Sequence, residues 1–222
     1  TIDDLTPERL EKDLNRYLKV AEIEVGYGLA FNIHSIKPQP RRYQEAQYPA
    51  YKVKIGFAQQ NNPSEMQRLR NKQSPSVIDI DISFNELLTV SDTEYIELNA
   101  NRSILCYSLS QIIAEKYRSL LQQPVRNRNR RQDVYDIYHL LTDYADYFAK
   151  ETTKHDVLEK LKRSAIGKNI DAYLHSEGIL APEIKTMALK DFDTLKLEIN
   201  ITQIDPHQMF DEIRVYYQAL PW

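Results

Sequence analysis

The chain has 222 residues, of which 42% are hydrophobic and 27% are charged, and its formal net charge is −3. This balance is typical of a globular protein with one large or two small domains, and it excludes a fibre or a disordered tail. The five glycines form no Gly-x-Gly-x-x-Gly or Walker loop, which excludes nucleotide binding by a glycine-rich loop. No apolar run is long enough for a membrane helix, and the single cysteine, Cys106, excludes an internal disulfide. We therefore expect a cytoplasmic protein.

The first half of the chain predicts one helix followed by strands. Residues 7–19 have leucines at four-residue spacing behind Thr6, a suitable N-cap, and therefore predict an amphipathic helix. Residues 29–36, 51–57 and 77–84 alternate apolar and polar side chains, as half-buried strands do. We expect an antiparallel or mixed sheet within residues 28–108, with polar loops at 37–49 and 59–76.

The second half of the chain has helical periodicity. Ser108 and Gln111 have the spacing of a capping box in front of an apolar helix. Further helices are expected at residues 133–149, 154–163, 169–177, 182–191 and 206–219, the last with Asp205 as its N-cap.

Two carboxylates, Asp79 and Asp81, lie two residues apart in the strand at 77–84 and therefore project from the same face. The alternate residues Ile78, Ile80 and Ile82 are expected to face the core. The acidic face is either solvated, as one face of an antiparallel sheet commonly is, or it helps to hold a hard cation such as Mg²⁺.

A basic segment, residues 116–132, contains six basic residues and no acidic one. Such a segment attracts the phosphates of a nucleotide or of RNA. Alternatively, it is a solvated helix end and loop, since cations at a helix C-terminus stabilise the helix.

Asp133 and Asp136 follow the basic segment at the spacing that places both on one helix face. Taken alone, Asp133 is either a functional acid or only a partner of the helix dipole, whereas Asp136 lies beside an apolar stripe. The five histidines are scattered without a metal-type pair, and no Ser/His/Asp arrangement stands out, which argues against the common covalent hydrolases.

Three segments together resemble the AbiEii/AbiGii toxin family of nucleotidyltransferase-like proteins. They are VIDIDISFNE at 77–86, SLSQIIAEKYRSLLQQ at 108–123 and RRQDVYDIYHLL at 130–141. The resemblance implies an α+β fold of the DNA-polymerase-β type, a mixed sheet flanked by helices and followed by a helical C-terminal region. The change from strand to helical periodicity places the domain boundary near residue 108, or loosely near 150. We expect an incomplete nucleotidyltransferase-like domain at 1–108 and a helical domain at 109–222.

The function that the resemblance implies is Mg²⁺-dependent transfer of a nucleotide from an NTP to an RNA such as tRNA, by a toxin encoded beside an antitoxin. Asp81, with Asp79, would contribute to metal binding. Lys116 would contact the triphosphate, Asp133 and Asp136 would be the paired acids that orient it or an arginine, and the phosphate contacts would include Arg118, Arg130 and Arg131.

Two departures from the family pattern stand beside this resemblance. The Gly-Gly-Thr-Ala-Leu-like helix start and the Ser-x-Asp-x-Asp strand of family members, which supply the main metal carboxylates, are absent here, and Gln132 replaces the usual Arg before Asp133. The alternative to an enzyme is therefore a truncated or inactive relative that binds RNA, an NTP or an antitoxin. We expect the native protein to carry the missing residues upstream of Thr1 if it is an enzyme.

Overall fold

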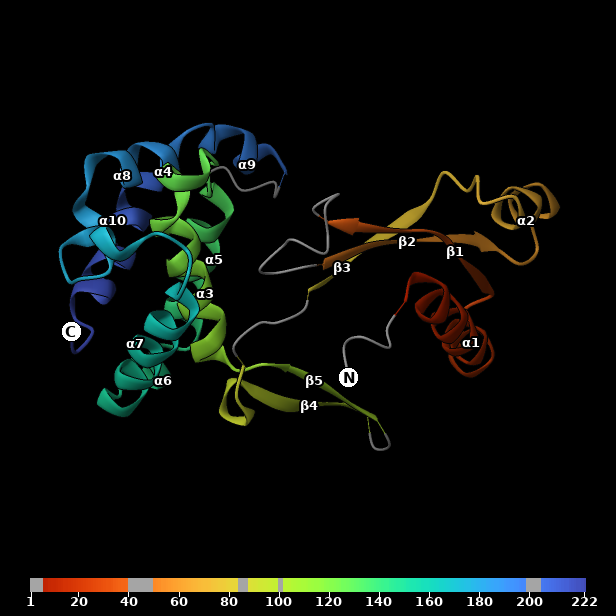
Figure 1. Ribbon diagram of the computed structural model, residues 1–222, viewed down its shortest axis with the longest axis horizontal. Helices are drawn as coiled ribbons and strands as arrows, with labels where there is room; N and C mark the ends of the chain where they lie inside the picture. The colour runs from red at the N-terminus through yellow and green to blue at the C-terminus, as the bar shows by residue number, and fades with distance from the viewer. Residues whose placement is uncertain (1–5, 40–49, 84–87, 100–101, 199–204) are drawn as a thin grey trace. The chain divides into compact units, whose positions relative to one another are not determined.

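A computed structural model describes residues 6–39, 50–83, 88–99, 102–198 and 205–222 (Figure 1). The chain forms two compact units, Thr1–Glu86 and Leu87–Trp222, which are considered separately. The domain boundary expected at residue 108 stays a prediction, although the strands at 93–107 belong to the second unit. Within the described residues, no helix is both long and apolar enough to span a membrane.

The first unit is a three-stranded antiparallel sheet with two helices. Its elements are α1 (Pro7–Val25), β1 (Leu29–Gln39), β2 (Ala50–Gln59), α2 (Pro63–Arg70) and β3 (Val77–Ser83), and the strand order is β1-β2-β3. The Thr6 hydroxyl caps α1, as the sequence predicts, and Gly26 ends the helix in the left-handed conformation that glycine adopts readily. The apolar face of α1 packs on β1 and β2 around Leu10, Ile33 and Val53.

The edge strand β3 is less buried than its sequence predicts. Ile78 and Ile80 are 44% and 40% exposed, and only Ile82 packs against the core below α1. The expectation that all three isoleucines are core residues is therefore wrong for two of them, because the core of this unit is centred on α1, β1 and β2, and β3 lies at the sheet edge.

Helix α2 lies where a polar loop was expected. The Asn62 side chain accepts a hydrogen bond from the Glu65 amide and donates one to the Glu65 carboxylate, and Pro63 occupies the first turn. This N-terminal signal is present in the sequence, but the helix is short and mostly polar, with Leu69 its single buried residue.

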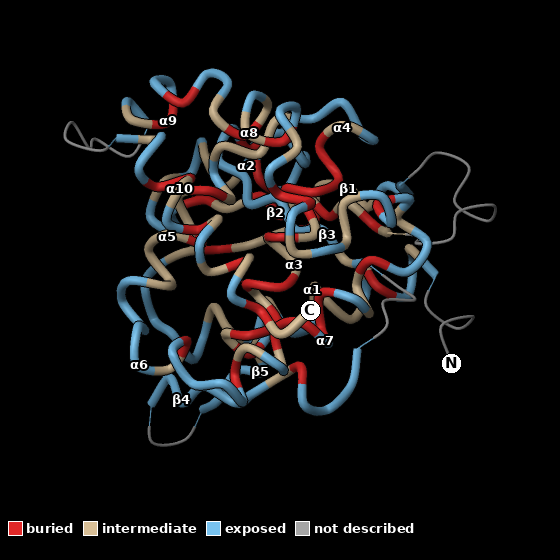
Figure 2. Tube along the Cα trace, turned by 90° about the vertical axis from the view of Figure 1, so that its left-hand side faces the viewer, coloured by how far each residue is buried: buried red, intermediate tan, exposed pale blue. Residues whose placement is uncertain are grey.

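The second unit is a β-hairpin on a helical body. It comprises η3 (Val90–Asp92), β4 (Thr93–Asn99), β5 (Arg102–Tyr107), α3 (Leu109–Leu121), α4 (Gln123–Arg126), α5 (Arg131–Asp143), α6 (Ala145–Phe148), α7 (Glu151–Ala165), η4 (Asp171–Tyr173), η5 (Gly178–Leu180), α8 (Pro182–Leu189), α9 (Phe192–Glu198) and α10 (Pro206–Gln218). Helix α3 is central, and its buried residues join those of α5, α7 and α10 in one core (Figure 2).

Two helix predictions in this unit are wrong in detail. The helix expected at 133–149 is interrupted at Tyr144, which leaves α5 and α6. The helix expected at 169–177 is replaced by one 3₁₀ turn, η4, and a second, η5, begins directly after it, because Asn169 has a positive φ and Gly178 approaches the carbonyl of Tyr173. Asp205 caps α10 as predicted.

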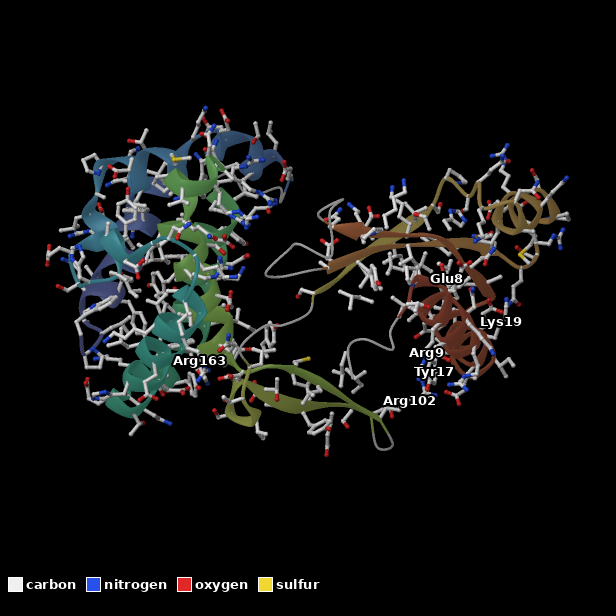
Figure 3. All side chains as sticks on the ribbon, viewed as in Figure 1. Glu8, Arg9, Tyr17, Lys19, Arg102 and Arg163 are labelled. Atoms are coloured by element: carbon white, nitrogen blue, oxygen red, sulfur yellow. The ribbon has the colours of Figure 1, made fainter. Side chains whose placement is uncertain are left out.

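A buried charge network joins the hairpin to the helices. Asp92, at the start of the hairpin, is fully buried and contacts Arg163 and Lys160 of α7. Figure 3 labels Arg163, which α7 contributes to this network. Lys160 also donates hydrogen bonds to Asp156 at 2.8 Å and to the Ser110 hydroxyl at 2.8 Å. Buried ions of opposite charge satisfy one another here, which fixes the base of the hairpin.

Candidate functional site

Helices α3 and α5 bring Lys116, Asp133 and Asp136 together. The Lys116 Nζ donates to Asp136 Oδ2 at 2.6 Å and to Asp133 Oδ1 at 3.3 Å. Ser108 caps the N-terminus of α3, and the three-residue spacing of the two acids places them on one face of α5. The predicted juxtaposition of the lysine with the paired acids is therefore present in the fold.

The charge of Lys116 is retained by its partners. Burial by itself would lower the pKa of this lysine, but the hydrogen bond to Asp136 and the charges of Asp133 and Asp136 outweigh it and raise the pKa above its ordinary value. The lysine side chain is 22% exposed, so it is screened from much of the solvent yet reachable by a ligand. Near neutral pH it is a fixed cation.

Asp133 is the more deeply placed acid of the pair. Its side chain is 13% exposed, against 41% for Asp136, and within the described residues its Oδ2 atom accepts no hydrogen bond. Burial raises the pKa of Asp133, while the nearby Lys116 and Arg130 oppose this rise. The Nε atom of Arg130 lies 3.9 Å from Oδ2, so one lone-pair side of this carboxylate remains available to a donor.

The loop between α4 and α5 carries the arginines. Gln123, which is buried, accepts a hydrogen bond from the Arg130 amide at 2.8 Å and donates to the carbonyls of Leu120 and Ile184, so its side chain fixes the loop. Burial lowers the pKa of Arg130, and the neighbouring guanidinium groups of Arg128, Arg118 and Arg126 add to the effect. The arginines are thus close enough to repel one another, and an anion would relieve that repulsion.

The predicted phosphate-binding arginines differ in their contacts. Arg118 donates to Glu115 at 2.9 Å and to Gln122 at 2.7 Å, and Arg131 pairs with Glu198 at 3.3 Å. Arg126 and Arg128 are exposed, and in the described part of the chain no acidic side chain pairs with either. The loop cations that are open to an external anion are therefore Arg126 and Arg128, with Arg130 behind them.

Asp79 and Asp81 lie in the first unit, on the exposed face of β3. The Lys54 Nζ is 3.8 Å from Asp79, and Lys52 is the cross-strand neighbour of Asp81. Two carboxylates that face two lysines are a poor donor set for Mg²⁺, which prefers several oxygen ligands. The residues that the structure describes contain no group of three or more His, Cys, Asp or Glu side chains able to hold a metal ion.

Two contributors to the site were not singled out from the sequence. Glu115 holds Arg118, and its i,i+3 spacing from that arginine is a recognisable signal of a helix-surface ion pair. Gln123 positions the arginine loop, but a buried glutamine between two apolar segments has no distinguishing pattern in the sequence.

A basic loop beside a lysine held by two acids, in an α+β chain, is an arrangement whose charge is suited to an anion, and phosphoryl-transfer proteins use such cationic groups to position phosphates. The family described as "Nucleotidyl transferase AbiEii toxin, Type IV TA system" matches residues 4–214, and the chain belongs to this family. Its mixed fold of small antiparallel sheets flanked by helices agrees with a nucleotidyltransferase-like fold. No curated protein and no solved structure matches the chain.

Proposed function

We propose that this toxin-family protein transfers a nucleotide from an NTP to an RNA acceptor such as tRNA, with Lys116 as its central phosphate contact. The observation that carries the proposal is the position of the Lys116 ammonium between Asp133 and Asp136, beside the arginine loop. Family membership supports nucleotidyl transfer as the reaction and an antitoxin as a partner. The NTP and RNA substrates imply that the protein acts in the cytoplasm.

The side chains of the second unit are suited to hold a triphosphate. An ammonium group has three N–H donors, and the two carboxylates take two of those of Lys116, which leaves one for a phosphate oxygen. Arg126 and Arg128 add positive charge that attracts the polyphosphate or the RNA backbone. When the acceptor hydroxyl attacks the α-phosphate, these cations stabilise the negative charge on the phosphate oxygens and on the departing pyrophosphate.

Mg²⁺ enters this proposal through the family resemblance alone. The carboxylates Asp79 and Asp81, with Lys54 and Lys52 opposite them, do not make up a metal site by themselves. The proposed charge stabilisation therefore rests on the cations of the second unit. Asp79 and Asp81 nevertheless remain the predicted metal-binding residues in the described part of the chain.

The test is incorporation of a radiolabelled nucleotide into total tRNA by the protein expressed with any residues that precede Thr1 in its gene, with Mg²⁺ and each NTP in turn. We expect incorporation that Lys116→Ala abolishes and that Lys190→Ala leaves unchanged, because Lys190 is exposed on the same unit. If the chain incorporates no label but retains NTP or RNA binding that depends on Lys116, it is a binding relative rather than an enzyme. Turnover that survives Lys116→Ala would remove this lysine from the mechanism.

A further inference from the structure

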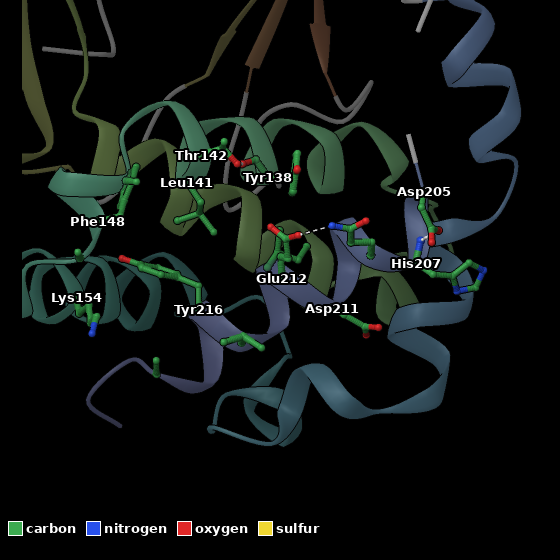
Figure 4. A pocket seen from close by; sticks show the side chains of 16 residues that line it. Tyr138, Leu141, Thr142, Phe148, Lys154, Asp205, His207, Asp211, Glu212 and Tyr216 are labelled. Carbon is green, nitrogen blue, oxygen red and sulfur yellow. Dashed lines mark hydrogen bonds between the residues drawn. The ribbon is translucent and has the colours of Figure 1, made fainter. Parts of the chain in front are cut away.

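An open groove of about 890 Å³ runs along α10 in the second unit (Figure 4). One wall is α10 itself, from Asp205 to Ala219, and the other is formed by α5, α6 and the start of α7. From Asp205 to Ala219, the two caps of α10, this wall rises by fourteen residue steps, which at about 1.5 Å per step is roughly 21 Å. The groove therefore has the length of about four helical turns, rather than the compact shape of a small-molecule pocket.

The groove is apolar at the end near α6. Leu141, Val215 and Tyr216 line it there over the buried Phe148, and Val215 is 59% exposed although it is a large aliphatic side chain. Lys154 of α7 also lines this end, and Glu151 neutralises it at 2.6 Å. The rings of Phe148 and Tyr216 meet edge to face with their centroids 5.8 Å apart, which makes this end firm. Exposed aliphatic surface along a preformed groove is characteristic of an interaction site.

The hydroxyl of Tyr216 adds a polar feature to this apolar end. Its oxygen is buried, and in the described residues it has no hydrogen-bond partner. Burial raises the pKa of Tyr216 well above its ordinary value, so the hydroxyl stays protonated. An unpaired buried hydroxyl is costly, so the ring is held in place by its packing against Phe148 rather than by a hydrogen bond.

The half of the groove from Asp205 to Glu212 is acidic. Asp205 caps its own helix at the far end, and Glu212, near the middle, accepts a hydrogen bond from the uncharged Gln208, so neither carboxylate has a cationic partner among the described residues. Asp211 differs, because Lys185 at 3.1 Å and Arg214 at 3.6 Å neutralise it. Two uncompensated carboxylates along one half of an apolar groove favour a ligand with cations on the matching half.

We propose that this groove binds an amphipathic helix of a partner protein, with leucine-like side chains against Val215 and Leu141 and a Lys or Arg against Glu212 or Asp205. The length, the apolar floor and the free carboxylates are the features of helix-in-groove recognition. The groove-lining Tyr138 and Leu141 lie about 140° around α5 from the midpoint of Asp133 and Asp136, so a bound helix would leave the Lys116 site uncovered. RNA is disfavoured there, because the carboxylates repel phosphates.

The experiment measures binding of a fluorescein-labelled peptide to the 222-residue chain by fluorescence anisotropy. The probe is a blocked peptide of about four helical turns, with leucines on one face and lysines on the other. We expect saturable binding that weakens about tenfold or more in Val215→Asp and in Glu212→Lys, since each alters one half of the groove. Leu197→Asp and Glu159→Lys, at exposed positions outside the groove, are the matched controls and should bind like the parent protein.

Three results would overturn the proposal. The first is equal affinity of the parent chain and both groove variants, which would mean that the peptide binds elsewhere. The second is equal binding of a leucine–glutamate peptide with the same pattern, since the carboxylates of the groove should reject it. The third is a dimer of the chain in sedimentation that Val215→Asp dissociates, since the occupant would then be a second copy. Circular dichroism of every variant checks that it is folded.

Discussion

The Nζ atom of Lys116, on α3, lies 2.6 Å from Oδ2 of Asp136, on α5, although 20 residues separate them in the chain. The contact is stronger than a solvent-exposed ion pair because the lysine is mostly buried and Asp133 joins it from one helical turn away. Asp136 therefore acts on the site through the orientation and charge state of Lys116, which makes it a positioning residue in the proposed reaction.

Replacement of Asp136 by Asn should lower the pKa of Lys116. Burial lowers this pKa, and the hydrogen bond from Lys116 to Asp136 is the largest of the effects that raise it. The pKa can be followed by NMR of ¹³C-dimethylated lysines, with the Lys116 signal assigned by its absence in Lys116→Arg. The signal of exposed Lys190 should not move; a Lys116 pKa that is unchanged in Asp136→Asn would show that the contact has no electrostatic role.

The raised pKa of Lys116 determines how the free energy of unfolding changes with pH. Because the pKa of Lys116 is raised on folding, its ion pairs stabilise the fold fully below the ordinary lysine value near 10.5, and this stability is lost as the pH rises through the folded-state pKa. Urea unfolding of the parent and of Lys116→Met should therefore differ most below that pH, and the difference should shrink above it. A difference that grew with alkaline pH would contradict the assigned direction.

Charge reversal of Arg126 and Arg128 should weaken RNA binding more than reversal of other exposed cations. These two arginines have no acidic partner in the described structure, so their charge is available to phosphates. We expect the double change to Glu to lower the affinity for tRNA by about tenfold or more at low salt and to flatten its salt dependence. The matched control is Lys190→Glu, and an equal loss in that variant would indicate only a change in net charge.

Local signals in the sequence predicted much of the fold. Thr6 before Pro7 and Ser108 before the α3 helix are N-caps whose hydrogen bonds involve neighbours three residues away, so the local sequence suffices to identify them. The exposure of Ile78 was not predictable in this way, because alternation identifies the two faces of a strand but does not tell which of them a helix covers.

The candidate site was predicted only in part, for a similar reason. The spacing of Asp133 and Asp136 places them on one helix face, but their contact with Lys116 depends on the packing of α3 against α5, and the family resemblance rather than the spacing indicated it. The partners of Arg118 and Arg131 were not foreseen. Glu198, which pairs with Arg131, lies 67 residues further along the chain, and no local pattern reports a contact of that range.

The buried network at the base of the hairpin should be sensitive to loss of a single partner. Asp92 is fully buried, so Asp92→Ala would leave Arg163 without an acidic partner among the described residues and leave Lys160 with Asp156 alone. We expect a cost of about 3 kcal/mol in the free energy of unfolding, the lower end of the range for a broken buried pair. Lys154→Ala, which removes an i,i+3 pair with the exposed Glu151, should cost about 0.5 kcal/mol or less. Denaturant unfolding measures both, and equal costs would show that the network contributes no more than a surface pair.

Gly178 should tolerate a methyl group much less well than Gly26. A Cβ atom on Gly178 would lie 1.8 Å from the carbonyl oxygen of Tyr173, which belongs to the backbone and cannot rotate away. Gly178→Ala must therefore displace the turn that Tyr217 also holds through its hydrogen bond to the Tyr173 carbonyl at 3.1 Å, and we expect a loss of about 3 kcal/mol or more. At Gly26 nothing lies within 4 Å, so alanine there meets only the strain of a positive φ, about 1 kcal/mol. Thermal and denaturant unfolding of the two variants provide the comparison, and a Gly178→Ala protein as stable as Gly26→Ala would mean that the turn between η4 and η5 is not closely packed.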